Sequence, residues 1–166
     1  MDKQTIRYRR QIRYMIIFFM VSLTISGLTA MPAREGVSWL VSVVPQSWTM
    51  IQAYLMSVRE ALYQCNSMLF YGYDWLAFAH IVIAVLFIGV LRDPVRNIWV
   101  VEFGMIACVM ILPFAFVMGE VRGIPVWWRL VDCSFGVVGI IPLWFVRDRI
   151  RRLEHTISIE RLNTVF

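Results

Sequence analysis

Long apolar runs without a charged side chain constrain this chain more than any other feature. The first of them, Tyr14–Ala33, has twenty residues and no charge. A helix needs about 20 mostly apolar residues to cross the hydrocarbon core of a bilayer. Inside lipid the backbone must satisfy its own hydrogen bonds, which a helix does. We therefore predict an integral membrane protein built from helices.

The composition supports this prediction and excludes other classes. Of the 166 residues, 60% are apolar and only 16% are charged, whereas about 25% are charged in an ordinary soluble domain. One soluble domain of this length cannot bury so much apolar surface. A disordered chain, a disulfide scaffold and a typical cytosolic enzyme are excluded on the same grounds.

The apolar runs divide the chain into four predicted spans, at residues 14–33, 73–91, 97–118 and 125–146. Between the first two spans lies an outer segment, residues 34–72. From Trp48 onward it carries apolar residues at steps of three and four, which predicts an amphipathic helix near Ser47–Asn66, with Ser47 as its cap. The predicted fold is all-α: one polytopic membrane domain, residues 1–166, with four transmembrane helices and an outer amphipathic helix at the interface.

The distribution of basic residues predicts the orientation. With four spans and a cytoplasmic N-terminus, twelve of the sixteen Lys and Arg residues fall on the cytoplasmic side, as the positive-inside rule requires. We therefore expect both termini, including the tail at residues 147–166, in the cytoplasm of a cell whose inner (cytoplasmic) membrane contains the protein. Bases clustered beside apolar runs suit an anionic lipid leaflet and not nucleic acid.

The N-terminal pattern of bases followed by apolar residues resembles a signal peptide. The residues three before the candidate cleavage sites are Leu28 and Met31, where a small residue is required. The sequence therefore predicts an uncleaved signal anchor.

Ionisable residues inside spans are costly, by roughly 2.5–3.5 kcal/mol on insertion scales, and are functional candidates for that reason. His80 and Asp132 each lie seven residues into a span that begins on the outer side. Asp132 shares a helix face with Gly136 and Gly139, and glycines allow close helix approach. These positions predict an outward-opening pocket that binds a ligand through Tyr73, His80, Trp128, Arg129 and Asp132.

Each polar residue also has a structural interpretation. Arg129 and Asp132 are three residues apart and would neutralise each other. His80 would form an interhelical hydrogen bond. Glu102 belongs to the opposite leaflet and is expected to lock the bundle by pairing with a base at the inner surface: Arg92, Arg96 or Arg147.

No catalytic motif is present: the sequence lacks HExxH, GxSxG, a P-loop and GxGxxG. We assign no catalytic residue and favour a non-enzymatic function. The three cysteines form no CxxC motif, so we expect no metal site, no disulfide and no cofactor. Cys108 and Cys133 lie in apolar runs and are predicted to pack as small side chains.

One part of the chain, Tyr71–Glu154, carries the motifs YGYDWLAFAH, LRDPVRN, RGIP and WRLVDCSFG. It resembles a family of small, uncharacterised, four-span inner-membrane proteins of bacteria. The resemblance covers about half of the chain. It implies a bacterial cytoplasmic membrane and carries no activity with it.

Three functional hypotheses follow from the sequence. The first is a module that binds or senses a small molecule or a lipid at the outward-facing polar pocket. The second is a structural or accessory subunit of a larger membrane complex, in which the outer helix contacts the partner. The third is a membrane-embedded enzyme that modifies lipids. The expected partners are membrane lipids and a second copy or a larger complex, without nucleic acid.

Overall fold

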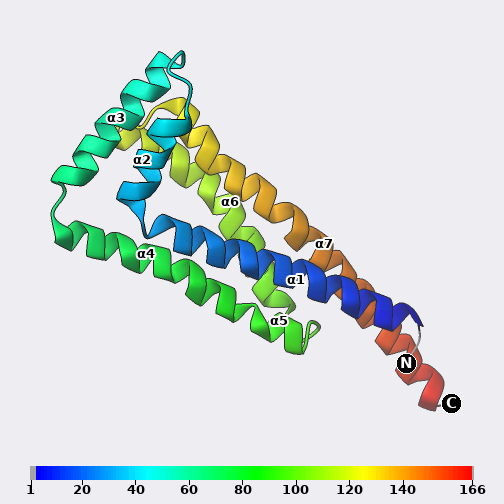
Figure 1. Ribbon diagram of the computed structural model, residues 1–166. Coiled ribbons are helices and arrows are strands. Elements are labelled where there is room, and N and C mark those ends of the chain that lie inside the picture. Colours follow the sequence, from blue (N-terminus) through cyan, green and yellow to red (C-terminus); the bar gives the residue numbers. More distant parts are fainter. Residues whose placement is uncertain (1–2, 166) are drawn as a thin grey trace. The chain divides into compact units, whose positions relative to one another are not determined.

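The computed structural model describes the backbone of residues 3–165 and the side chains of residues 3–160 (Figure 1). Every element in this range is a helix, which confirms the all-α class. In chain order the helices are α1 (Lys3–Ala30), α2 (Ala33–Val43), α3 (Thr49–Gln64), α4 (Ser67–Leu86), α5 (Ile88–Arg92), α6 (Ile98–Val121) and α7 (Val126–Val165).

Four stretches are long and apolar enough to cross a membrane, as predicted. They are Lys3–Ala30, Ser67–Arg92, Ile98–Val121 and Val126–Glu160. The second comprises α4 and α5 together, and the fourth continues as helix through the predicted tail to Val165. The chain is thus a multi-pass membrane protein.

The predicted amphipathic helix at Ser47–Asn66 is present as α3. The prediction that Ser47 caps it is wrong: the N-cap position is Trp48, and no side chain there makes a capping hydrogen bond. The reason is a turn in which the Trp48 N–H donates to the Pro45 carbonyl at 3.0 Å. This turn places Ser47 one residue before the cap position.

The chain forms two compact units. The first contains Met1–Met20 and Leu86–Phe166, and we call it the α6–α7 unit; the second is Val21–Val85, which we call the α2–α3 unit. Helix α1 contributes residues to both.

In the α6–α7 unit, α7 lies beside α6 and continues beyond its end (Figure 1). Small residues bring them together, because a Cβ on Gly136 of α7 would lie 2.5 Å from the Cys108 carbonyl oxygen of α6. This confirms that the glycine face of the fourth span packs against a helix. The core of this unit consists of fully buried side chains: Ile12, Ile16, Phe87, Val90, Val100, Val101, Leu143, Val146, Ile150 and Leu153.

In the α2–α3 unit, polar side chains connect the helices. The Gln52 amide donates to the Val41 and Val44 carbonyls of the α2 end, at 3.1 and 2.6 Å. Arg34 donates to the Leu62 carbonyl at the end of α3, at 3.1 Å. The buried apolar side chains of this unit are fewer and smaller on average: Leu55, Ala77 and Ala84.

Candidate functional site

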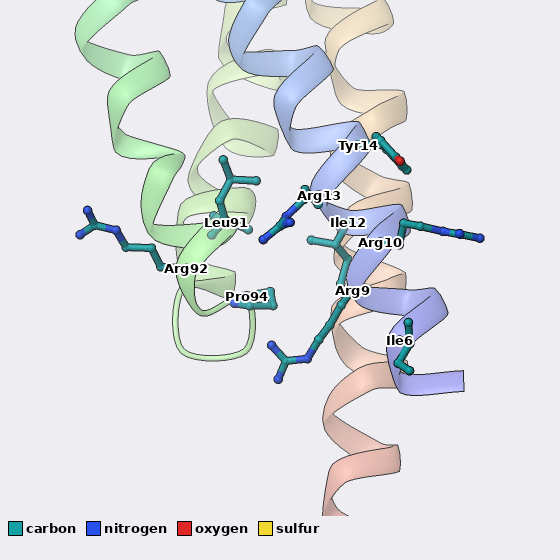
Figure 2. Close-up of a pocket in the computed structure, with 10 residues that line it drawn as sticks. Ile6, Arg9, Arg10, Ile12, Arg13, Tyr14, Leu91, Arg92 and Pro94 are labelled. Carbon is teal, nitrogen blue, oxygen red and sulfur yellow. The ribbon is translucent and has the colours of Figure 1, made fainter. Parts of the chain in front are cut away.

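A cavity of about 600 Å³ lies in the α6–α7 unit, between α1, α5 and the turn that follows α5 (Figure 2). Four arginines contribute to its wall: Arg9, Arg10, Arg13 and Arg92. The remaining wall is largely apolar and includes Ile12, Val90, Leu91 and Pro94. We call it the arginine-lined cavity.

The local structure explains why the arginines gather there. Arg9 and Arg13 are four residues apart in α1 and therefore share one face of the helix. Arg92 is the last residue of α5. The turn after it is fixed by Asn97, whose amide donates to the carbonyls of Gly89 at 3.0 Å and Asp93 at 2.9 Å. Two elements distant in sequence thus present cations to one space.

Among the described side chains, no acid neutralises these cations. In the part of the chain with described side chains, no carboxylate lies within 4.0 Å of the four cavity guanidinium groups. The acid closest to Arg92 in sequence, Asp93, instead accepts a hydrogen bond from the Arg96 backbone N–H at 3.1 Å. The arginine-lined cavity therefore carries uncompensated positive charge.

Figure 2 shows that the four arginines do not all point the same way. The Arg13 guanidinium extends into the space between Leu91 and Pro94, and that of Arg9 ends below Pro94 on the same side of α1, whereas those of Arg10 and Arg92 extend away from the space between α1 and α5. A guanidinium presents five N–H donors in a planar fork that matches the oxygens of a phosphate or carboxylate. The cavity is chemically suited to an anion.

The cavity also lies where the chain changes from charged to apolar. Arg13 is the last charged residue before the uncharged run that begins at Tyr14, and Arg92 is the first charge after the uncharged run Trp75–Leu91. Both transitions occur in the cavity wall. A ligand seated there meets both cations and apolar side chains.

The sequence-predicted residues Tyr73 and His80 belong to α4, in the α2–α3 unit. Tyr73 is exposed and His80 is half-buried. The His80 Nδ1 lies 3.1 Å from the Leu76 carbonyl oxygen, one turn earlier in the same helix. This hydrogen bond is within one helix, not between two helices as the structural interpretation expected.

Trp128, Arg129 and Asp132 belong to α7, in the α6–α7 unit. Arg129 is only 8% exposed, and it donates to the Glu120 carboxylate and the Ile124 carbonyl, both at 2.7 Å. The expected Arg129–Asp132 pair is therefore wrong, because the turn after α6 brings Glu120 to the arginine instead. Asp132 is half-buried, and Trp128 stacks edge-on against Trp127.

The five residues of the predicted outer pocket are thus divided between the two units, and a common pocket stays a prediction. Glu102 behaves as expected: its carboxylate accepts from Arg147 at 2.9 Å and from Arg151 at 3.4 Å, which joins α6 to α7. Of the three expected partners, Arg147 is the one observed.

Sequence reasoning missed the arginine-lined cavity. The sequence interpretation used these arginines for the orientation of the chain and for attraction to an anionic leaflet, and it did not place Arg92 beside Arg9 and Arg13, which are four residues apart in α1. Within the described residues, no three His, Cys, Asp or Glu side chains form a group that could hold a metal ion. No protein family, curated protein or solved structure matches this chain. Its function is therefore inferred from its own residues.

Proposed function

We propose that this membrane protein binds an anionic lipid by its headgroup in the arginine-lined cavity. The supporting observation is that four arginines line a cavity at the charged-to-apolar boundary of two spans, and that none of them has an acidic partner among the side chains that the structure describes. Basic pockets between transmembrane helices are sites of this kind. The proposal keeps the class predicted from the sequence, a lipid-binding module, and assigns the ligand to a different place.

The interaction free energies that arginines make with anionic lipids favour a lipid headgroup as the ligand. Each base close to an anionic membrane surface contributes roughly 1 kcal/mol, and charge-assisted hydrogen bonds from arginine to phosphate are about twice as strong as neutral ones. A free inorganic anion would use the cations only. A lipid uses the cations and the apolar wall at once.

The orientation is part of this proposal. With twelve of sixteen bases on one side, both termini face the cytoplasm of a bacterial inner membrane, and the cavity opens at the cytoplasmic leaflet. Labelling a cysteine added at the C-terminus of a variant in which Cys65, a free cysteine of the outer segment, is replaced by serine tests this with an impermeant reagent in intact cells. Protection until the cells are lysed is expected, whereas labelling of intact cells would contradict the orientation.

The binding test uses the purified full-length chain, stripped of lipid in a mild detergent. Phosphatidylglycerol is expected to raise the Tm more than phosphatidylcholine with the same acyl chains, and added salt should reduce the difference. A ligand at a hundred times its Kd stabilises by about 2.7 kcal/mol. Equal shifts with the two lipids would contradict the proposal.

The location of the lipid-binding site is tested by replacing the four cavity arginines together: R9Q, R10Q, R13Q and R92Q. The charge-matched control replaces four bases outside the cavity: R7Q, R59Q, R96Q and R122Q. The first variant should lose the extra shift with phosphatidylglycerol and the control should keep it. Loss of the shift in the control would mean that net charge alone attracts the lipid.

A second candidate function, an accessory subunit of a larger membrane complex, is favoured by the α2–α3 unit. Its large apolar side chains are exposed, for example Trp39 at 63%, Trp48 at 57% and Met50 at 79%. Purification from native membranes in mild detergent tests it. A stoichiometric larger partner supports this function, whereas a monomer or homodimer counts against it.

A further inference from the structure

Two of the four cavity arginines differ from the others in a way that bears on which headgroup binds. Arg13 reaches into the space beside Leu91 and Pro94 and Arg9 ends below Pro94 on the same side of α1, while Arg10 and Arg92 extend away from that space (Figure 2). All four side chains are exposed, so their orientation is not imposed by burial. The two inward cations come from one face of α1, one helical turn apart.

The helix that carries this pair is firmly held. Ile12 and Ile16, on an adjacent face of α1, are 2% and 0% exposed in the core of the α6–α7 unit. The spacing of the Arg9 and Arg13 backbones is therefore set before any ligand arrives. A preorganised site loses less conformational freedom on binding.

Charge balance points to one class of headgroup. Two guanidinium groups carry two positive charges at any physiological pH, and neither has an acidic partner within 4.0 Å in the described side chains. A phosphomonoester carries about −1.5 to −2 near neutral pH and has three strong acceptor oxygens. A phosphodiester has one negative charge and fewer free oxygens, so it leaves one arginine unbalanced.

We propose that Arg9 and Arg13 form a clamp specific for the dianionic phosphomonoester of a lipid headgroup. This inference rests on the proposed function. Arg10 and Arg92 add positive potential at the rim without contacting the phosphate. Leu91 and the apolar residues around it contact the first carbons of the acyl chains. The shared chemistry, a phosphomonoester, also occurs in soluble metabolites, and the apolar wall favours the lipid.

The experiment compares four ligands on the purified full chain in detergent: dioctanoyl phosphatidic acid, phosphatidylglycerol and phosphatidylcholine, and soluble glycerol 3-phosphate. Wild-type protein is expected to bind phosphatidic acid about tenfold more tightly than phosphatidylglycerol, a difference of about 1.4 kcal/mol. Glycerol 3-phosphate should bind more weakly than phosphatidic acid, and equal affinities would overturn the assignment to a lipid.

Two double variants of equal charge assign the specificity to residues. R9Q/R13Q is expected to lose the tenfold preference for phosphatidic acid, whereas R10Q/R92Q should keep it while binding all anionic lipids more weakly. Loss of the preference in R10Q/R92Q, or its retention in R9Q/R13Q, would overturn the clamp. The Tm of each lipid-free variant, expected to equal that of wild type, shows that the fold is intact.

A third variant keeps the measurement informative if R9Q/R13Q does not fold. R9K/R13K retains both charges but lacks the planar fork of donors. It should still bind anionic lipids more tightly than phosphatidylcholine, but it should lose most of the preference for phosphatidic acid over phosphatidylglycerol. An unchanged preference would overturn the clamp.

The same data separate the two proposals. If phosphatidic acid and phosphatidylglycerol bind equally well and both bind more tightly than phosphatidylcholine, the clamp fails and the proposed function stands. If neither binds more tightly than phosphatidylcholine, both fail.

Discussion

The two units of this protein are similarly rich in apolar residues but use them differently. The α6–α7 unit buries large side chains completely, among them Phe87, Leu143 and Ile150 at 0% exposed. In the α2–α3 unit the buried apolar side chains are Leu55, Ala77 and Ala84, each 3% exposed. In the α6–α7 unit large side chains pack together, whereas in the α2–α3 unit side-chain hydrogen bonds connect α2 to α3 and α1 approaches α4 closely at Gly27 and Ala77.

The difference between the units indicates that a fixed site in a membrane protein is built where helices pack closely. Lipid is as apolar as a leucine side chain, so helices associate through close packing and polar contacts and not through the hydrophobic effect. The α6–α7 unit achieves close packing through Gly104 and Gly136. It is also the unit whose α1 and α5 segments form the arginine-lined cavity.

The largest expected effect on stability comes from truncating a buried side chain in the core of the α6–α7 unit. Phe87→Ala removes a fully buried ring that contacts Phe19 at a centroid distance of 5.0 Å. It should lower the free energy of unfolding by about 3–5 kcal/mol. The matched control Phe78→Ala, at a ring that is 46% exposed in the α2–α3 unit, should cost much less in the same unfolding titration. Equal losses of unfolding free energy in the two variants would contradict the difference in packing between the units.

The second prediction concerns the hydrogen bonds that connect the α2–α3 unit. Arg34 donates to two carbonyls at the end of α3, those of Leu62 and Cys65, and its guanidinium lies 4.4 Å from the Phe70 ring centroid. Arg34→Ala should weaken this unit by about 1.5–3 kcal/mol, the range for hydrogen bonds to a charged group. Hydrogen exchange of α3 amides is the measurement. Arg59→Ala is the control, and equally fast exchange in both variants would show that Arg34 is not the connection.

Helix approach in the α6–α7 unit is tested with Gly136→Val. The new side chain would meet the Cys108 carbonyl of α6, which should cost about 1–3 kcal/mol by overpacking. Gly72 of the α2–α3 unit has nothing within 4 Å of an added Cβ, so Gly72→Val should leave the Tm nearly unchanged. A tolerated Gly136→Val would mean that the two helices are not closely packed.

A smaller effect is expected from the ion pairs between α6 and α7. Glu102→Gln removes the negative charge that pairs with Arg147 and Arg151, whose side chains are 38% and 57% exposed. Partly exposed pairs contribute up to about 1 kcal/mol and weaken with salt. The Tm difference between wild type and variant should therefore shrink in high salt. A difference that does not depend on salt would point to packing and not to charge.

The smallest effect distinguishes the arginine-lined cavity from the pocket predicted from the sequence. His80→Ala and Asp132→Ala, made singly and together, should not change the extra Tm shift produced by phosphatidylglycerol, because neither residue lines the cavity. Loss of that shift would assign the lipid to the predicted pocket of Tyr73, His80, Trp128, Arg129 and Asp132. The measurement is the same lipid titration as for the arginine variants.

Several local features could be predicted because they depend on residues close together in sequence. The spacing from Trp48 onward indicated α3, and Asp132, Gly136 and Gly139 indicated the packed face of α7. The predicted partner of Arg129 was wrong because the true partner depends on the path of the chain and not on residues close in sequence. Asp132 is close in sequence, but the turn after α6 brings Glu120 within 2.7 Å, and a turn's geometry cannot be read from residue spacing.

The sequence by itself determined that this chain crosses a membrane four times, because the length of an uncharged apolar run and the obligation to satisfy backbone hydrogen bonds are local properties. Only the tertiary structure decided which bases gather around a cavity. Arg9 and Arg92 are 83 residues apart along the chain (92 − 9), and they share a wall because α1 and α5 border the same cavity in one unit.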